Sequence, residues 1–264
     1  MKITKNELKE MINESVERQL SKINTKKINQ HNNHQKNNHR QKVDERSNTD
    51  YKYFPKNKNE LKQIIKQEIK MNGINCDLNM IDTGRITDMS GLFYSSKFNG
   101  NISKWNVSNV TNMNSMFENS DFNGDISKWN VSNVIDMSSM FYYSEFNQDI
   151  SKWNVSNVSI MSTMFYYSKF SRDISKWNVG KVKTMSSMFE YSIFNKNISN
   201  WNISKVTDMS WMFTNSKFNQ NISRWFTKLN PIVNLKDFGV FNKVNINLYE
   251  EFKQYYRQTI LDKF

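Results

Sequence analysis

ISKWNVSNVTNMNSMFENSDFNGD, residues 102–125, is followed without a gap by ISKWNVSNVIDMSSMFYYSEFNQD, residues 126–149. The two stretches align residue for residue, and the same 24-residue frame continues in both directions. Tryptophan marks this frame at Trp105, Trp129, Trp153, Trp177, Trp201 and Trp225. A fixed period of this length is typical of repeat architectures, in which each unit packs on its neighbours. We therefore predict six to seven 24-residue repeats over residues 78–225.

Other large apolar side chains also return every 24 residues, and they predict the core. Two of these columns are Met89, Met113, Met137, Met161, Met185 and Met209, and Phe93, Phe117, Phe141, Phe165, Phe189 and Phe213. A single unit of this size cannot bury so many large side chains, whereas stacked units cover one another's flanks. We expect the methionines to fill the core, because thioethers adapt to irregular gaps. The tryptophans are expected there too; the alternative, a platform for stacking sugars or bases, requires outward-facing rings.

The spacing within one repeat predicts its local structure. Trp105 and Val107 alternate with a polar residue, as in a short strand with one face buried. Val110, Met113 and Phe117 have the spacing of one face of a short helix. The predicted fold is therefore an α/β repeat solenoid. It is leucine-rich-repeat-like, with one short parallel strand and one short helix per 24-residue turn and with helical caps at both ends.

The repeat sequence resembles a known family. NISKWNVSNVTNMNSMF and DISKWNVSNVIDMSSMF are similar to the BspA-type leucine-rich-repeat family, also called the mycoplasma surface-protein repeat. Residues 51–93 resemble the entry module that often precedes such repeats. The resemblance implies a solenoid used for binding, commonly on bacterial surfaces, with no catalytic residues to carry over.

The two ends differ from the repeats. Residues 1–23 have the pattern of an amphipathic helix, which is a self-association helix, a docking peptide or a frayed helix. Residues 24–50 are almost free of apolar side chains and are predicted to be a disordered polar linker. Residues 51–77, which contain a second amphipathic stretch, are expected to form the N-terminal cap. After Trp225 the repeat frame dissolves, so residues 226–264 are expected to form the C-terminal cap.

Charge is concentrated near the start of the chain. The net charge is +12, and the first 72 residues contribute 17 Lys and Arg against 9 Asp and Glu. The repeats themselves are therefore only weakly basic, which disfavours nucleic acid as their partner. Nonspecific nucleic-acid binding by the basic N-terminal arm stays an alternative. The three histidines, His31, His34 and His39, lie in the polar linker, which favours a solvated segment over a metal site.

The outward positions of the predicted strands define a candidate binding face. They place lysine in one file, with asparagine beside it, next to a column of serine and glycine. The candidate partner-binding residues are Lys104, Asn106, Lys128, Asn130, Lys152, Asn154, Lys176, Asn178, Asn202 and Arg224. Adjacent strands lie about 4.8 Å apart, so the lysines create a local positive potential. The alternative is an ordinary solvated repeat surface.

These patterns predict a noncatalytic binding scaffold that presents its sheet face to a protein or glycan. An enzyme is not expected, because the sequence has no catalytic motif, and neither a cofactor nor a metal is predicted. The lone Cys76 permits no intramolecular disulfide. No run of about 18 apolar residues predicts a membrane span. The start of the chain lacks the apolar stretch of a secretory signal, so an intracellular or virion-associated location stays open beside the bacterial surface. A structural or virion assembly component, docked through residues 1–23, is the alternative function.

Overall fold

The computed structural model describes residues 51–226, 228–230, 232–239 and 254. The chain divides into two compact units, Met1–Thr49 and Asp50–Phe264, and the described residues belong to the second. The amphipathic helix and the polar linker expected over residues 1–50 lie outside the described residues. So does most of the expected C-terminal cap.

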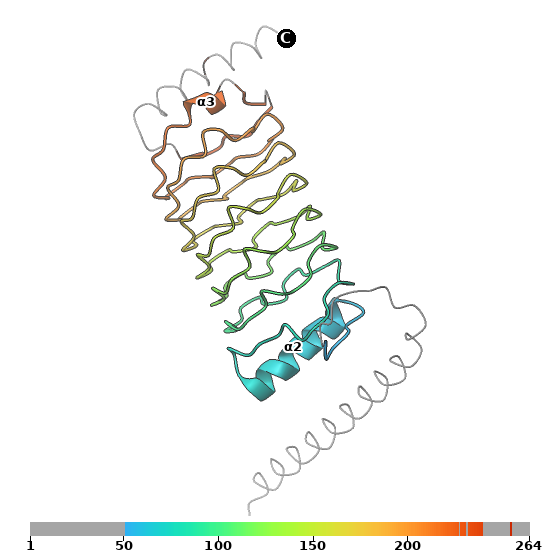
Figure 1. Ribbon diagram of the computed structural model, residues 1–264. Helices are drawn as coiled ribbons and strands as arrows, with labels where there is room; N and C mark the ends of the chain where they lie inside the picture. The colour runs from blue at the N-terminus through green and yellow to red at the C-terminus, as the bar shows by residue number, and fades with distance from the viewer. Residues whose placement is uncertain (1–50, 227, 231, 240–253, 255–264) are drawn as a thin grey trace, which may run out of the picture. The chain divides into compact units, whose positions relative to one another are not determined.

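Helix α2, Lys58–Asn72, lies at one end of a stack of coils (Figure 1). It begins where the Asn57 side chain accepts a hydrogen bond from the Glu60 amide at 3.1 Å, and it ends at Gly73, whose φ is 84°. Leu61 and Ile65 are buried and join the same apolar core as the coils. The amphipathic stretch in residues 51–77 therefore covers the first coil with its apolar face.

One buried carboxylate fixes α2 to the segment before it. Glu68 accepts hydrogen bonds from the Lys52 ammonium at 3.0 Å, from the Asn72 amide at 2.7 Å and from the Tyr53 hydroxyl. Burial alone raises the pKa of Glu68, but the hydrogen bonds from Tyr53 and Lys52 outweigh it and lower the pKa below its ordinary value. The carboxylate is therefore charged at neutral pH, with its lone pairs used inside the protein.

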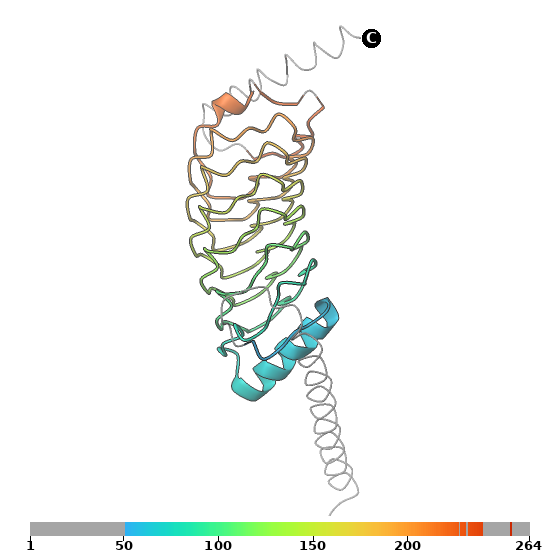
Figure 2. The same cartoon turned by 45° about the vertical axis from the view of Figure 1, so that its right-hand side comes forward.

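The 24-residue units follow one another as coils of similar outline (Figure 1, Figure 2). Parallel backbone bridges join equivalent positions of consecutive coils, from Asp88 to Asn112 and onward through Asp136, Ile160, Thr184 and Asp208. Each coil thus contributes one bridged residue to a ladder that runs the length of the repeats. The register never slips between these positions, because every repeat has the same length.

The helix expected in each repeat does not form; within the described residues the α-helices are α2 and α3, Ser223–Phe226. Ser115 and Asn119 have φ values of 53° and 51°, in the left-handed region, which interrupts a right-handed helix. Their amides bond to the next coil instead, as Ser115 N to Ser138 O at 2.9 Å and Phe117 N to Met140 O at 3.0 Å show. The expectation of a helix was wrong because these N–H groups find carbonyls in the neighbouring coil, whereas a helix directs them to residue i−4.

The strand is also displaced from its expected place. The Trp105 amide closes a turn within its own coil by donating to Ile102 O at 3.1 Å, and the Val110 amide does the same with Val107 O at 3.0 Å. Residues 105–107 therefore lie between two turns, and the inter-coil pairing passes through Asn112. The alternation of Trp105 and Val107 correctly indicated which side chains point inward, but not where the backbones pair.

The predicted burial of the tryptophan, methionine and phenylalanine columns is confirmed. No tryptophan of the column exceeds 4% exposure, and Met113 and Phe117 are fully buried. Equivalent rings stack across coils: the Phe117 and Phe141 centroids are 5.7 Å apart and the Trp105 and Trp129 centroids 6.4 Å apart, with nearly parallel planes. Each buried aromatic contributes roughly 2–3 kcal/mol by the area removed from water, so stacking is the main source of stability.

The ladder continues beyond Trp225, where the sequence frame seemed to end. Met209 N bonds to Asn234 O at 2.9 Å and Phe213 N to Phe238 O at 3.0 Å. Elsewhere such partners are 23 residues apart, as in the bond from Met185 N to Asp208 O, so this last turn carries two extra residues. Those two residues hide the continuation from a fixed-period reading. Buried Phe238 then packs edge-on against Phe213.

Candidate functional site

All ten candidate residues are exposed, as expected, but they stand on turns and not on paired strands. We call this surface the lysine-turn face; its members are Lys104, Asn106, Lys128, Asn130, Lys152, Asn154, Lys176, Asn178, Asn202 and Arg224. Each lysine is the third residue of the turn that ends at the tryptophan, for example Ile126 to Trp129. Its place on a sheet face was a wrong expectation, because the tryptophan amide is used inside its own coil.

The asparagines of this face have a structural task as well. Asn154 Oδ1 accepts the Ser156 amide at 3.2 Å, and Asn106 Oδ1 accepts the Ser108 amide at 3.1 Å. Such side-chain bonds to the backbone two residues on stabilise tight turns. The lysine and arginine side chains, which extend from the turns, are therefore better candidates for contact with a partner than the asparagines.

Aspartates at the start of the lysine turns are held in their charged form. Asp149 Oδ1 accepts the Ser151 amide at 2.8 Å, and Asp173 Oδ1 accepts the Ser175 amide at 2.8 Å. Hydrogen bonds from the serine amide and hydroxyl are the main reason why the pKa of both carboxyls lies below its ordinary value. Nearby lysines lower it further. These carboxylates therefore offset part of the lysine charge at neutral pH.

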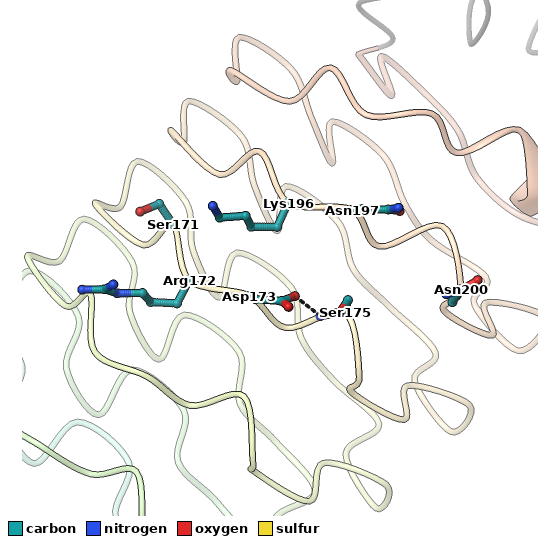
Figure 3. Close-up of a pocket in the computed structure, with 7 residues that line it drawn as sticks. All are labelled: Ser171, Arg172, Asp173, Ser175, Lys196, Asn197 and Asn200. Atoms are coloured by element: carbon teal, nitrogen blue, oxygen red, sulfur yellow. Dashed lines mark hydrogen bonds between the residues drawn. The ribbon is translucent and has the colours of Figure 1, made fainter.

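A shallow polar depression of about 540 Å³ lies between two coils beside the lysine turns (Figure 3). Its lining consists of Ser171, Arg172, Asp173, Ser175, Lys196, Asn197 and Asn200. Arg172 and Lys196 come from neighbouring coils and extend in the same direction (Figure 3). An adjoining depression of about 330 Å³ shares Arg172 and Asp173 and adds Lys176. Cations, amides and hydroxyls thus converge on a region open to solvent.

The sequence analysis did not single out Arg172 and Lys196. The equivalent position in the other repeats is Gly100, Gly124, Gln148 and Gln220, so these two coils alone carry a cation there. Arg172 is also anchored, because its Nε donates to Asn147 O at 2.8 Å. The signal was a change of residue type against the repeat pattern. Averaging the repeats into one consensus concealed it.

A second surface feature that the sequence analysis missed is a group of tyrosines on three consecutive coils. We call it the tyrosine cluster; its members are Tyr142, Tyr143, Tyr166, Tyr167 and Tyr191. The Tyr142 and Tyr166 ring centroids are 4.6 Å apart, and those of Tyr143 and Tyr167 are 4.7 Å apart, with interplanar angles of 3° and 9°. This spacing equals that of adjacent parallel backbones. The stacking of the coils therefore also stacks these rings.

The family model described as "Mycoplasma protein of unknown function, DUF285" matches residues 59–169 and again residues 144–248. Together the two matches cover well over half of the chain and take in α2 as well as the coils. The chain belongs to this family. No curated protein and no solved structure matches it.

The two matches overlap over residues 144–169, which is about one coil. The family model is therefore met twice along one continuous stack, as expected for a repeat protein. Neither match identifies a site. The residues that vary between the DUF285 repeats of this chain are therefore the most informative guide to function.

Other chemistry is scarce in the part of the DUF285 chain that the structure describes. Cys76 is partly buried, and burial raises the pKa of its thiol, which disfavours the reactive thiolate. Within the described residues no three His, Cys, Asp or Glu side chains come together as metal ligands. None of the described helices has the length and apolarity to cross a bilayer. His31, His34 and His39 lie outside the described residues.

Proposed function

We propose that this protein is a noncatalytic binding scaffold, a leucine-rich-repeat-like solenoid of BspA type whose lysine-turn face binds a glycan or protein. The observation that carries the proposal is the polar depression beside that face, where Arg172 and Lys196 break the repeat pattern. A scaffold of identical coils has no structural need for this change, because both side chains are exposed. Cations placed on a rigid, polar surface suit a ligand with carboxylate or hydroxyl groups.

The shape of the depression supports binding and not catalysis. It is shallow and lined by exposed or half-buried polar side chains, whereas catalytic groups act in sites that exclude water. Its acidic member, Asp173, is engaged by the Ser175 amide. The family resemblance to bacterial surface repeats agrees with this function. The alternatives that depend on residues 1–50, assembly through an N-terminal helix and nucleic-acid binding through a basic arm, concern residues outside the described ones.

The test is a screen of the full chain on a glycan array and against extracellular matrix and serum proteins. Arg172→Gln with Lys196→Gln gives the depression the residue that Gln148 and Gln220 provide in other coils, so the fold is kept. We expect at least a tenfold loss of affinity for the ligand found. A matched control, Lys181→Asn with Lys205→Asn, removes two charges away from the depression and restores the residue of Asn157. It should leave binding within about twofold.

Two results contradict the proposal. Turnover of a captured ligand excludes a noncatalytic role. Equal loss of affinity in the depression variant and the control variant means that only overall charge matters. In that case the binding is nonspecific, and it will weaken steeply with salt in both variants.

A further inference from the structure

The tyrosine cluster departs from the repeat pattern at two neighbouring positions. Along the stack, the first position is Glu118, Tyr142, Tyr166, Glu190 and Thr214; the second is Asn119, Tyr143, Tyr167, Tyr191 and Asn215. Only the middle coils therefore carry the aromatic side chains. The backbone at these positions is the same throughout, since Asn119 N bonds to Tyr142 O at 2.7 Å and Tyr143 N to Tyr166 O at 2.8 Å.

Stability does not explain these tyrosines. Tyr143, Tyr167 and Tyr191 have φ values of 52°, 49° and 55°, in a region that asparagine adopts readily and bulky side chains seldom do. Their side chains also remain 52%, 49% and 44% exposed, so little apolar area is removed from water. Asparagine at the same place in Asn119 and Asn215 fits the conformation better. A strained, exposed aromatic residue that recurs on adjacent coils indicates a contact with something outside the chain.

The geometry of the rings narrows the kind of partner. Because the stacked rings cover one another's faces, their edges and hydroxyl groups are left toward solvent. A sugar or a planar base stacks on an exposed ring face, which this arrangement largely removes. Protein partners, in contrast, commonly use tyrosine edges and hydroxyls at the centre of their interfaces. The cluster therefore favours a protein segment over a glycan.

The charges around the cluster narrow the partner further. Glu118 and Glu190 flank the tyrosines in the same column, and exposed Glu145 follows Tyr143 by two residues; Lys169 is the one cation at equivalent positions on these coils. Glu190 is close enough to contribute, after burial, to a raised pKa of Tyr166. The rim is thus acidic although the whole chain carries +12. This local reversal of sign suits a basic partner.

We propose that the tyrosine cluster docks a short segment of a partner protein that is rich in lysine or arginine. The basic groups donate hydrogen bonds to the glutamate carboxylates and the tyrosine hydroxyl oxygens, and their aliphatic stems pack on the ring edges. The surface spans three coils, or two steps of about 4.8 Å each, and so fits only a few residues of extended chain. None of the residues that line the depression of Figure 3 belongs to this cluster, so the two surfaces are independent.

The experiment measures fluorescence anisotropy of two labelled nonapeptides, three repeats of Arg-Ser-Leu and three repeats of Glu-Ser-Leu, against the full chain. The basic peptide is expected to bind at least tenfold more tightly than the acidic one, against the net charge of the protein. Tyr143→Asn, Tyr167→Asn and Tyr191→Asn together, which copy Asn119 and Asn215, should weaken the basic peptide at least tenfold. Glu118→Thr with Glu190→Thr, which copies Thr214, should weaken it at least threefold.

The matched control is Asn215→Ser, which changes an equivalent position to the residue of Ser95 and should leave affinity unchanged. Tryptophan fluorescence verifies that each variant is folded. The proposal is overturned if the acidic peptide binds as well as the basic one, or if the tyrosine variant binds both normally. It is also overturned if the wild-type chain sediments as a dimer that the tyrosine variant loses, since the occupant is then a second copy.

A glycan signal lost with the tyrosine variant likewise overturns the choice of a protein segment. The depression variant, Arg172→Gln with Lys196→Gln, should leave the basic peptide's affinity unchanged. Failure of the tyrosine cluster as a docking site is therefore distinguishable from failure of the function proposed for the lysine-turn face.

Discussion

The indole nitrogen of Trp153 donates a hydrogen bond of 3.1 Å to the backbone carbonyl of Ile126, in the preceding coil. The same bond, to the residue 27 positions earlier, is made by Trp129, Trp177, Trp201 and Trp225. The carbonyl it satisfies belongs to the turn that carries a lysine of the lysine-turn face. Each tryptophan thus fills the core and fixes the position of that turn in the coil before it.

Trp153→Phe should destabilise the fold by about 2–3 kcal/mol, because it leaves the buried Ile126 carbonyl without its donor and removes part of a large side chain. Urea unfolding followed by far-ultraviolet circular dichroism measures this change. Trp211→Phe is the control: Trp211 is half-buried and lies under Lys236 Nζ at 4.9 Å. A loss below about 1 kcal/mol is expected there, and equal losses would contradict the role assigned to the indole bond.

Removal of one whole coil should leave a folded protein. Deletion of residues 126–149 joins Asp125 to Ile150, so every amide again meets a carbonyl of the adjacent coil in the same register. Deletion of only residues 126–137 places apolar columns beside polar ones and should prevent folding. Circular dichroism and tryptophan emission compare the two. A folded 12-residue deletion would show that neighbouring coils do not depend on a fixed register.

Glu68→Gln should reduce stability at pH 7 by about 1–2 kcal/mol, since the amide replaces a charged acceptor of three hydrogen bonds. The pKa of Glu68 is lowered on folding, so the carboxylate's contribution is complete above the unfolded pKa of about 4.3 and is lost as pH falls through the folded value. The difference between wild type and variant should thus be constant from about pH 5 to 7 and shrink below about pH 4. Urea unfolding at several pH values checks this, with exposed Glu145→Gln as control.

Tyr143→Asn with Tyr167→Asn should change the free energy of unfolding by less than about 1 kcal/mol. The loss of one exposed ring stack, about 0.5–1.5 kcal/mol, is offset because asparagine tolerates the left-handed backbone better. Thermal and urea unfolding of the full chain provide the comparison. A destabilisation of several kcal/mol would mean that the cluster serves the fold, and would remove one argument for a docked partner.

The period of 24 residues and the buried columns could be read from the sequence, because apolar side chains at fixed places, such as Trp153 and Met161, have no alternative to burial. The exposure of Lys152 and its equivalents followed from the same pattern. The sequence also held, unread, the departures at Arg172, Lys196 and the tyrosine cluster. These were visible only by comparing the repeats with one another position by position.

The tertiary structure alone decided where the backbone hydrogen bonds go. The spacing of Val110, Met113 and Phe117 is compatible with a helix and equally with turns that direct alternate amides into the next coil. The choice depends on carbonyls such as Ser138 O and Met140 O, which lie 23 residues further along the chain and become neighbours only when the coils stack. For the same reason the exposed rings of Tyr143 and Tyr167 come into contact only in the folded stack.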